Sequence, residues 1–211
     1  MKYSASKTID MTEKPEEVIS INTALWNKMY KASILKEIKE IENPPRILED
    51  MMFLALVYLK INKISFVEDY LYYYMVRSDS IMATIKKEQL ESTEKAMLDV
   101  KKIYESEEAG KRLLPVLDAM AFLHFGISLM FRISADKTSN FKEELKKNKE
   151  YLDSNFSSWR TSEYLKLSYC MKHKSNTKVA IMRKIYKSGL FRVFLALYNF
   201  MINKLKIDIK W

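Results

Sequence analysis

The chain has 211 residues, 48% of them hydrophobic, which is enough for one substantial folded domain or for a domain with a helical extension. Its three glycines argue against the glycine-rich phosphate loops of nucleotide-binding folds, and a single cysteine, Cys170, excludes an internal disulfide. The net charge of +9 comes mostly from lysines on segments that also carry glutamate, which is typical of solvated helix faces. An anionic membrane or substrate is the alternative partner, and no nucleic-acid-binding signature accompanies the charge.

The N-terminal part of the chain predicts a mixture of helix and strand. Residues 1–20 are polar and contain no apolar stretch, so no signal peptide is expected there. Residues 21–41 predict a short extended segment and then a helix, which Pro44 and Pro45 end because proline lacks an amide donor. Residues 51–60 predict the next helix. Residues 62–77 are rich in β-branched and aromatic side chains, which favours one or two strands.

From Thr84 onward the pattern is helical to the end of the chain. The sequence therefore predicts an α+β fold that is mostly α. We expect a change of character near residue 85, between a mixed segment of residues 1–85 and a helical region of residues 86–211. The helical segments are expected at residues 84–106, 111–134, 139–156, 162–174 and 177–206.

Two adjacent carboxylates, Glu49 and Asp50, stand directly before the apolar run that starts at Met51. Acidic side chains at a helix start accept bonds from free backbone amides and oppose the positive end of the helix dipole. The same position also suits a catalytic carboxylate. Helix capping and catalysis are compatible interpretations of this pair.

Three segments in order carry a resemblance to a known family. The first is Trp26-x-Lys28-x-Tyr30, the second is Glu49-Asp50, and the third runs from Tyr72 through Tyr74, Arg77 and Ser80 to Ile81. Together they resemble the C-terminal, acceptor-side half of family 2 glycosyltransferases, which have the GT-A fold. The resemblance covers roughly residues 20–84, and it implies an α/β segment of GT-A type there.

The resemblance implies inverting transfer of a sugar from a nucleotide donor to a glycan or lipid-linked acceptor, as in surface polysaccharide assembly. Asp50 takes the position of the general base and Glu49 supports it. Arg77 is placed to bind the leaving diphosphate, or is a surface arginine at a strand end. The remaining substrate-binding candidates are Trp26, Lys28, Tyr74 and Ser80. Core packing for the aromatic residues, and pairing with a nearby acid for Lys28, are the alternatives.

The family's donor half carries an Asp-x-Asp motif for a divalent metal, and no two aspartates of this chain are spaced that way. We therefore expect no cofactor in this chain, and Mg²⁺ or Mn²⁺ only together with a donor-binding half. Such a half, or a second copy of the chain, is an expected partner, because edge strands have unpaired backbone groups that can bind another chain. The chain by itself is then expected to be inactive. A non-enzymatic helical adaptor in a membrane or glycan-assembly complex is the alternative function.

Two helical segments raise the question of membrane contact. Residues 187–211 predict a basic amphipathic helix that lies in the headgroup zone of a bilayer or packs on the helical region. Residues 113–131 are apolar, but Pro115, Asp118 and His124 favour a buried core helix over a membrane span. His124 and His173 show no ligand spacing, so no metal site is expected. The implied location is the cytoplasm, at the inner face of the cell membrane.

Overall fold

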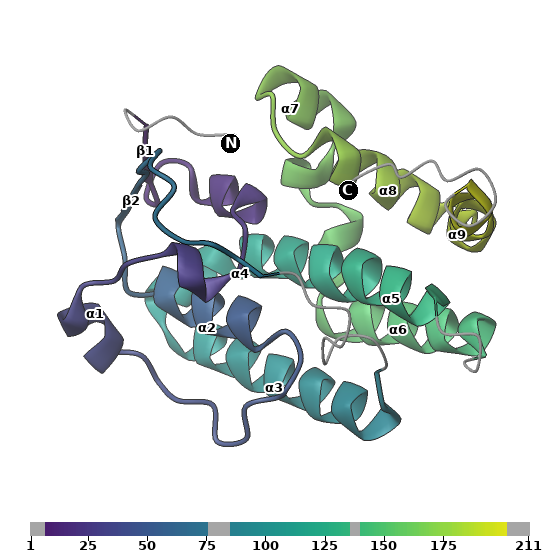
Figure 1. The fold of residues 1–211 in the computed structure, drawn as a ribbon, viewed down its shortest axis with the longest axis horizontal. Coiled ribbons are helices and arrows are strands. Elements are labelled where there is room, and N and C mark those ends of the chain that lie inside the picture. The colour runs from purple at the N-terminus through teal and green to yellow at the C-terminus, as the bar shows by residue number, and fades with distance from the viewer. Residues whose placement is uncertain (1–6, 76–84, 136–139, 202–211) are drawn as a thin grey trace. The chain divides into compact units, whose positions relative to one another are not determined.

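A computed structural model describes residues 7–75, 85–135 and 140–201 of the chain. The fold is 67% helical with one small two-stranded sheet among these residues, which confirms the expected α+β, mostly α class. The chain forms two compact units, residues 1–117 and 118–211, each of which is described by itself (Figure 1). The boundary between these compact units is not the change of sequence character expected near residue 85. The division into domains at residue 85 stays a prediction.

The first unit contains a short antiparallel sheet. Strand β1 (Thr8–Asp10) pairs with β2 (Lys63–Ser65), and Ile9 lies opposite Ile64. The Met11 amide extends this pairing by donating to the Asn62 carbonyl over 2.7 Å. The helices of this unit are η1 (Pro15–Ser20), η2 (Leu25–Asn27), α1 (Ala32–Lys36), α2 (Glu49–Tyr58), α3 (Lys87–Ser106) and the first part of α4 (Glu108–Ala121).

Helix α2 forms the centre of the first unit. Its sequence is apolar on nearly every side after the first turn, and the residues from Met51 to Tyr58 are buried apart from Phe53. Helix α3 buries one face against this core, with Ala96, Met97, Val100 and Tyr104. The Tyr104 hydroxyl donates to the Ala55 carbonyl over 2.6 Å, so the two helices are joined by a buried hydrogen bond as well as by apolar contact.

The helix expected over residues 21–41 is wrong except for α1. The Asn22 side-chain oxygen accepts a bond from the Ala24 amide at 2.7 Å, and the Lys28 ammonium donates to the Asn22 and Ala24 carbonyls. These local bonds satisfy backbone groups that a helix would otherwise need. Met29 is 94% exposed, so a longer helix would bury no continuous apolar face here.

The strand expected over residues 62–77 is confirmed only for β2. Residues 66–75 lie outside any strand, and Tyr70, Leu71 and Tyr73 are 91%, 78% and 88% exposed. Residues 76 and 77 lie outside the described residues. Their neighbours have strong β propensity, but a strand also needs a ladder partner, and β1 is only three residues long.

The second unit is entirely helical in its described part. It contains the end of α4, the π-helical segment η4 (Phe122–Leu129), α5 (Met130–Ala135), α6 (Phe141–Asn155), η5 (Ser157–Arg160), η6 (Glu163–Leu165), α7 (Leu167–Lys172), α8 (Thr177–Lys187) and α9 (Phe191–Phe200). These agree with the helical pattern expected after Thr84. An added Cβ at Gly126 would lie 3.1 Å from Leu152, so glycine permits the close approach of η4 and α6.

Aromatic side chains fill the core of the second unit. Trp159 is fully buried and stacks on Phe122, with ring centroids 4.7 Å apart and planes within 3°. Tyr186 meets both rings edge-on at 5.5 Å. Each contact is of a geometry that adds to the free energy of apolar burial.

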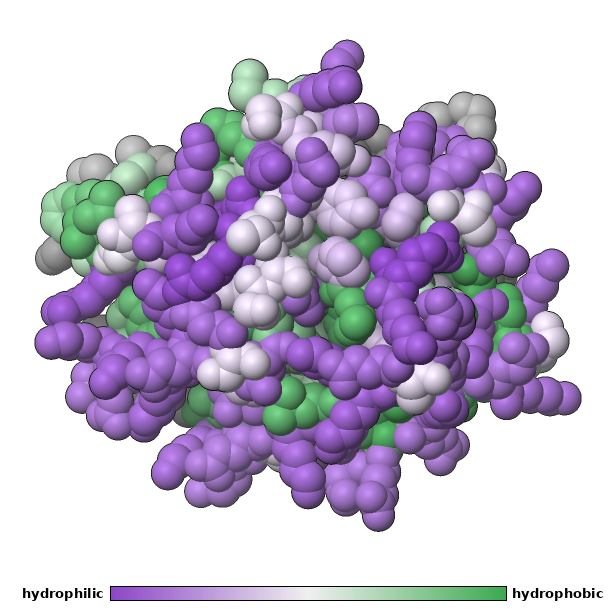
Figure 2. Space-filling model, turned by 180° about the vertical axis from the view of Figure 1, so that it is seen from behind, coloured by the Kyte–Doolittle hydropathy of each residue, from purple (hydrophilic) through white to green (hydrophobic). Residues whose placement is uncertain are grey.

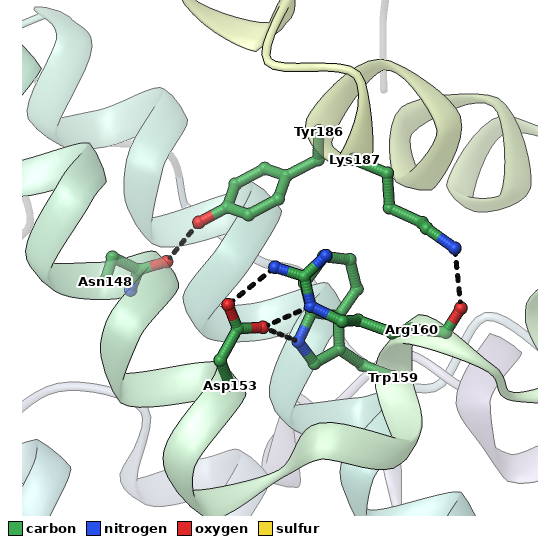
Figure 3. Close-up of polar contacts among 6 residues, drawn as sticks. All are labelled: Asn148, Asp153, Trp159, Arg160, Tyr186 and Lys187. Carbon is green, nitrogen blue, oxygen red and sulfur yellow. Dashed lines mark hydrogen bonds and ion pairs between the residues drawn. The ribbon is translucent and has the colours of Figure 1, made fainter.

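A polar network surrounds this core (Figure 3). Asp153 of α6 accepts bonds from the Trp159 indole and, in bidentate fashion, from Arg160, at 2.5–3.2 Å. The Arg160 guanidinium thereby lowers the pKa of the Asp153 carboxyl. The Tyr186 hydroxyl donates to Asn148 over 2.8 Å. Burial raises the pKa of that hydroxyl above its usual value.

The helical stretch Glu108–Ala135 is long and apolar enough to cross a membrane by length and composition, but 72% of its most apolar window is buried inside the protein. Asp118 in this stretch accepts a bond from the Ser158 amide at 3.0 Å. Burial, together with the Arg132 charge, lowers the pKa of His124 to about 4, so this imidazole is neutral at pH 7. The burial favours the core-helix interpretation of residues 113–131.

Candidate active site

The candidate site is built around the start of α2. Leu48 precedes this helix in the left-handed conformation, at φ 60°, which few non-glycine residues adopt. This turn places Glu49 and Asp50 in the first helical turn, with Glu49 exposed and Asp50 half-buried. Neither carboxylate makes a hydrogen bond or ion pair with the part of the chain that the structure describes. The Asp50 oxygens are therefore not occupied by any described residue.

Lys28 and Tyr30 lie close enough to Asp50 for its charge to act on them. Burial lowers the pKa of the Lys28 ammonium to about 8, and Asp50 acts in the opposite direction. Burial, together with the Asp50 charge, raises the pKa of the Tyr30 hydroxyl to about 12. The Tyr30 ring lies edge-on to Phe53 at 5.7 Å, so α2 positions it. The segment that ends in Tyr30 and the start of α2 thus form one surface.

The Tyr30 hydroxyl has a feature that bears on ligand binding. Its oxygen is buried, yet it has no hydrogen-bond partner among the described residues. A buried hydroxyl without a partner costs free energy that a ligand hydroxyl or a water molecule can recover. Tyr30 is therefore a candidate ligand-binding residue. In the sequence it appeared only as part of the Trp26-x-Lys28-x-Tyr30 motif, with no binding role.

The Lys28 ammonium is engaged by the chain's own oxygens. Its Nζ lies 2.5 Å from the Asn22 carbonyl, 2.6 Å from the Ala24 carbonyl and 2.7 Å from the Asn27 side-chain oxygen. An ammonium has three donors, so these contacts occupy all of them. Lys28 holds the turn before Tyr30 in place, and its direct contact with substrate stays a prediction.

Trp26, Tyr72 and Tyr74 form an aromatic cluster. Trp26 stacks on Tyr72 at 5.0 Å and on Tyr74 at 5.2 Å, with interplanar angles of 24° and 14°. All three side chains remain more than 40% exposed. These residues therefore do not pack in the core, because a large part of their aromatic surface faces solvent. Residues 70–75 have no regular secondary structure. The stacking of Trp26 on Tyr72 and Tyr74 connects them to the Trp26–Tyr30 segment.

Some expected site residues fall elsewhere. Arg77, Ser80 and Ile81 lie outside the described residues, so the diphosphate-binding role of Arg77 and the substrate role of Ser80 stay predictions. Glu49 is exposed beside Asp50 without contacting it through any hydrogen bond. The structure brings together Asp50, Lys28 and Tyr30, and separately Trp26, Tyr72 and Tyr74.

The described residues do not provide a metal site. Within residues 7–75, 85–135 and 140–201, no three His, Cys, Asp or Glu side chains are grouped to hold an ion. Glu49 and Asp50 are neighbours, but two carboxylates alone make a poor site for a divalent cation. The chemistry that these residues support is proton transfer by a carboxylate and stacking by aromatic rings.

Comparison of this chain with models of known protein families, with curated proteins and with solved structures found no match. The functional argument therefore rests on the residues and on their geometry.

The pH dependence of stability gives a test of the Lys28 environment. A lowered pKa means that the folded state binds fewer protons than the unfolded state between about pH 8 and the usual lysine value. The free energy of unfolding should therefore rise with pH in this window. We expect wild type to gain about 1 kcal/mol relative to Lys28→Met between pH 7 and pH 9.5, after solvent screening.

Urea unfolding at a series of pH values measures this difference. Lys31→Met, at an exposed position three residues further on, is the matched control and should follow wild type at every pH. Parallel stability curves for wild type and Lys28→Met would show that the Lys28 ammonium is not desolvated in the folded chain.

Proposed function

We propose that the chain is the acceptor-side part of a glycosyltransferase, in which Asp50 removes the proton of an acceptor hydroxyl. The observation that carries this proposal is the Asp50 carboxylate, half-buried and without a hydrogen bond in the described chain, beside the Trp26–Tyr30 segment. An acceptor hydroxyl loses its proton as it attacks the anomeric carbon. A positioned carboxylate can take that proton.

The aromatic cluster supplies the binding part of the proposal. Sugar rings present C–H faces that pack on aromatic rings, and Trp26, Tyr72 and Tyr74 offer exposed aromatic surface at one place. Tyr30 adds a hydroxyl without a partner in the described chain. Apolar stacking combined with hydroxyl contacts is the combination that a polyhydroxylated ligand needs.

Transfer needs a nucleotide-binding part in addition to these residues. The resemblance concerns acceptor-side elements alone, and the described residues hold no metal-binding group for a diphosphate. We expect a donor-binding half with its divalent metal to complete the enzyme. Residues 67–75, which are exposed and belong to no strand, offer such a half a place to bind.

Binding of saccharides tests the proposal on this chain by itself. Trp26→Leu should weaken binding of cello-, chito- or galacto-oligosaccharides about tenfold, because an aromatic stacking contact contributes about 1–1.5 kcal/mol. Saturation-transfer NMR and titration calorimetry measure the affinity. Tyr70→Leu, at a 91% exposed aromatic residue that makes no ring contact with another described residue, is the control and should bind as wild type does.

An adaptor function is the second candidate, and the exposed segment of residues 67–75 favours it. Val67, Leu71 and Met75 are 59%, 78% and 75% exposed, which is more apolar surface than a free loop usually presents. An adaptor would bind a protein partner there and have no affinity for saccharides. Absence of saccharide binding by wild type, across the whole panel, would favour the adaptor and contradict the glycosyltransferase proposal.

A further inference from the structure

Helix α9 of the second unit is apolar on two opposite faces. Phe191 and Leu195 are 1% exposed. The buried face packs on α5, where Phe131 meets Phe191, Phe194 and Tyr198 edge-on at 5.1–6.1 Å. Asn199 donates to the Ser134 carbonyl at 3.4 Å on the same side. Packing within the second unit therefore accounts for the apolar residues on this face of α9. It does not account for those on the opposite face.

The opposite face of α9 carries an apolar stripe that faces solvent. We use the name exposed stripe for four residues: Leu190, Val193, Leu197 and Phe200. Their spacings of three and four residues align them along one side of a helix. They are 58%, 56%, 59% and 55% exposed. Figure 2 shows hydrophobic side chains at its left edge, where the rotated view places α9. A helix that is apolar on both sides and covered on one needs a second covering surface.

The described chain segment that carries α9 has charge of one sign. Residues 164–201 contain eight lysines and arginines and not one aspartate or glutamate. Residues 164–211 have a net charge of +10, whereas residues 1–163 have a net charge of −1. The exposed cations of residues 164–201 are Lys166, Lys172, Lys174, Lys178, Lys184, Lys187 and Arg192. The net positive charge of the protein thus arises from the C-terminal segment that carries the exposed stripe.

An anionic bilayer fits both features. Apolar side chains of an interfacial helix enter the acyl boundary, while lysines and arginines attract anionic headgroups, at about 1 kcal/mol for each cation near the surface. A nucleic acid would satisfy the cations but leave the stripe in water. The ten residues of α9 span about 15 Å, too short to cross a bilayer. The helix therefore lies in the plane of the surface.

We propose that the second unit docks on an anionic phospholipid bilayer through the exposed stripe of α9, with the surrounding lysines and arginines on the headgroups. None of the residues of the candidate active site belongs to this surface. The docking is thus independent of the proposed sugar transfer, and either can fail without the other.

Vesicle co-sedimentation tests the proposal. The full chain should bind vesicles that contain phosphatidylglycerol and phosphatidylcholine, bind phosphatidylcholine alone much less, and release as salt is raised. The double variant Val193→Ser, Leu197→Ser should bind anionic vesicles at least tenfold less tightly, because two apolar side chains no longer enter the acyl boundary. Its helical circular dichroism should equal that of wild type, since both positions are exposed.

The matched control is Val67→Ser, Leu71→Ser, which removes the same two residue types from exposed positions in the first unit. It should bind vesicles as wild type does. Equal binding by the two double variants, or equal binding of wild type to neutral and anionic vesicles, overturns the proposal. Self-association of wild type in the absence of lipid, abolished by the α9 variant, also overturns it, because a second copy then covers the stripe.

Discussion

Replacing Asp50 with Asn should lower the rate of sugar transfer by about 100- to 10,000-fold, the usual contribution of a general base. Asparagine keeps the shape of the side chain and its place in the first turn of α2, but it cannot accept the acceptor's proton. The loss should be in kcat more than in KM, because the proton moves only as the transition state forms. The assay follows release of nucleotide diphosphate by the chain assembled with its donor-binding half.

The control for this variant is Glu88→Gln. Glu88 is the second residue of α3, as Asp50 is the second residue of α2, so both changes remove one carboxylate from the same helical position. Each costs the same small interaction with the helix dipole. Glu88→Gln should transfer at the wild-type rate. If Asp50→Asn and Glu88→Gln retain equal rates, Asp50 is a helix-start residue and nothing more.

Trp159→Ala should lower the free energy of unfolding of the second unit by about 3–5 kcal/mol, the range for removing a large buried aromatic side chain. Trp159 is fully buried and joins Phe122 of η4 to Tyr186 of α8 through its two ring contacts. Its indole also donates to Asp153, so the variant opens a cavity and removes one of that carboxylate's donors.

Urea unfolding followed by circular dichroism measures this loss. Trp26→Ala is the matched control, because Trp26 is 42% exposed and stacks on exposed tyrosines. Its cost should be about 1 kcal/mol. Equal shifts of the unfolding midpoint for the two tryptophan variants would contradict the assignment of Trp159 to the core of the second unit.

The helices could be predicted from sequence because their apolar periodicity is strong. The buried positions of α3, from Ala96 to Tyr104, repeat every three or four residues, and α2 follows directly on an acidic helix start. Segments without a buried face were harder to assign. Around Asn22 and Lys28, side-chain bonds to the backbone replace a helix, and no periodic pattern shows those bonds in advance.

The strand prediction shows the limit of composition. Residues 66–75 are rich in aromatic side chains, but β propensity describes how side chains fit a sheet and does not supply a partner strand. The partner that exists, β1, is short and lies in a segment of polar character, so nothing in its sequence drew attention to it. Long-range pairing of Ile9 with Ile64 is a property of the folded chain.

Part of the candidate site could be predicted, and part could not. The order of the Trp26, Asp50 and Tyr74 segments predicted that they belong to one site, and the structure places Trp26 beside Tyr74 and Tyr30 near Asp50. The occupied donors of Lys28 and the unpartnered Tyr30 hydroxyl depend on side-chain geometry, which sequence does not give. The net positive charge of residues 164–211 is visible in the sequence, and a count of acidic and basic residues along the chain finds it.

The most direct test of the central claim is a map of where a saccharide touches this chain. Labelled protein titrated with an oligosaccharide that it binds should show saturable NMR shift changes at the Trp26 indole and at the amides of residues 49–51. The buried indole of Trp159 should not move. Shift changes elsewhere, with the Trp26 and Asp50 signals unmoved at saturation, would contradict the account, because the proposed base would then have no acceptor beside it.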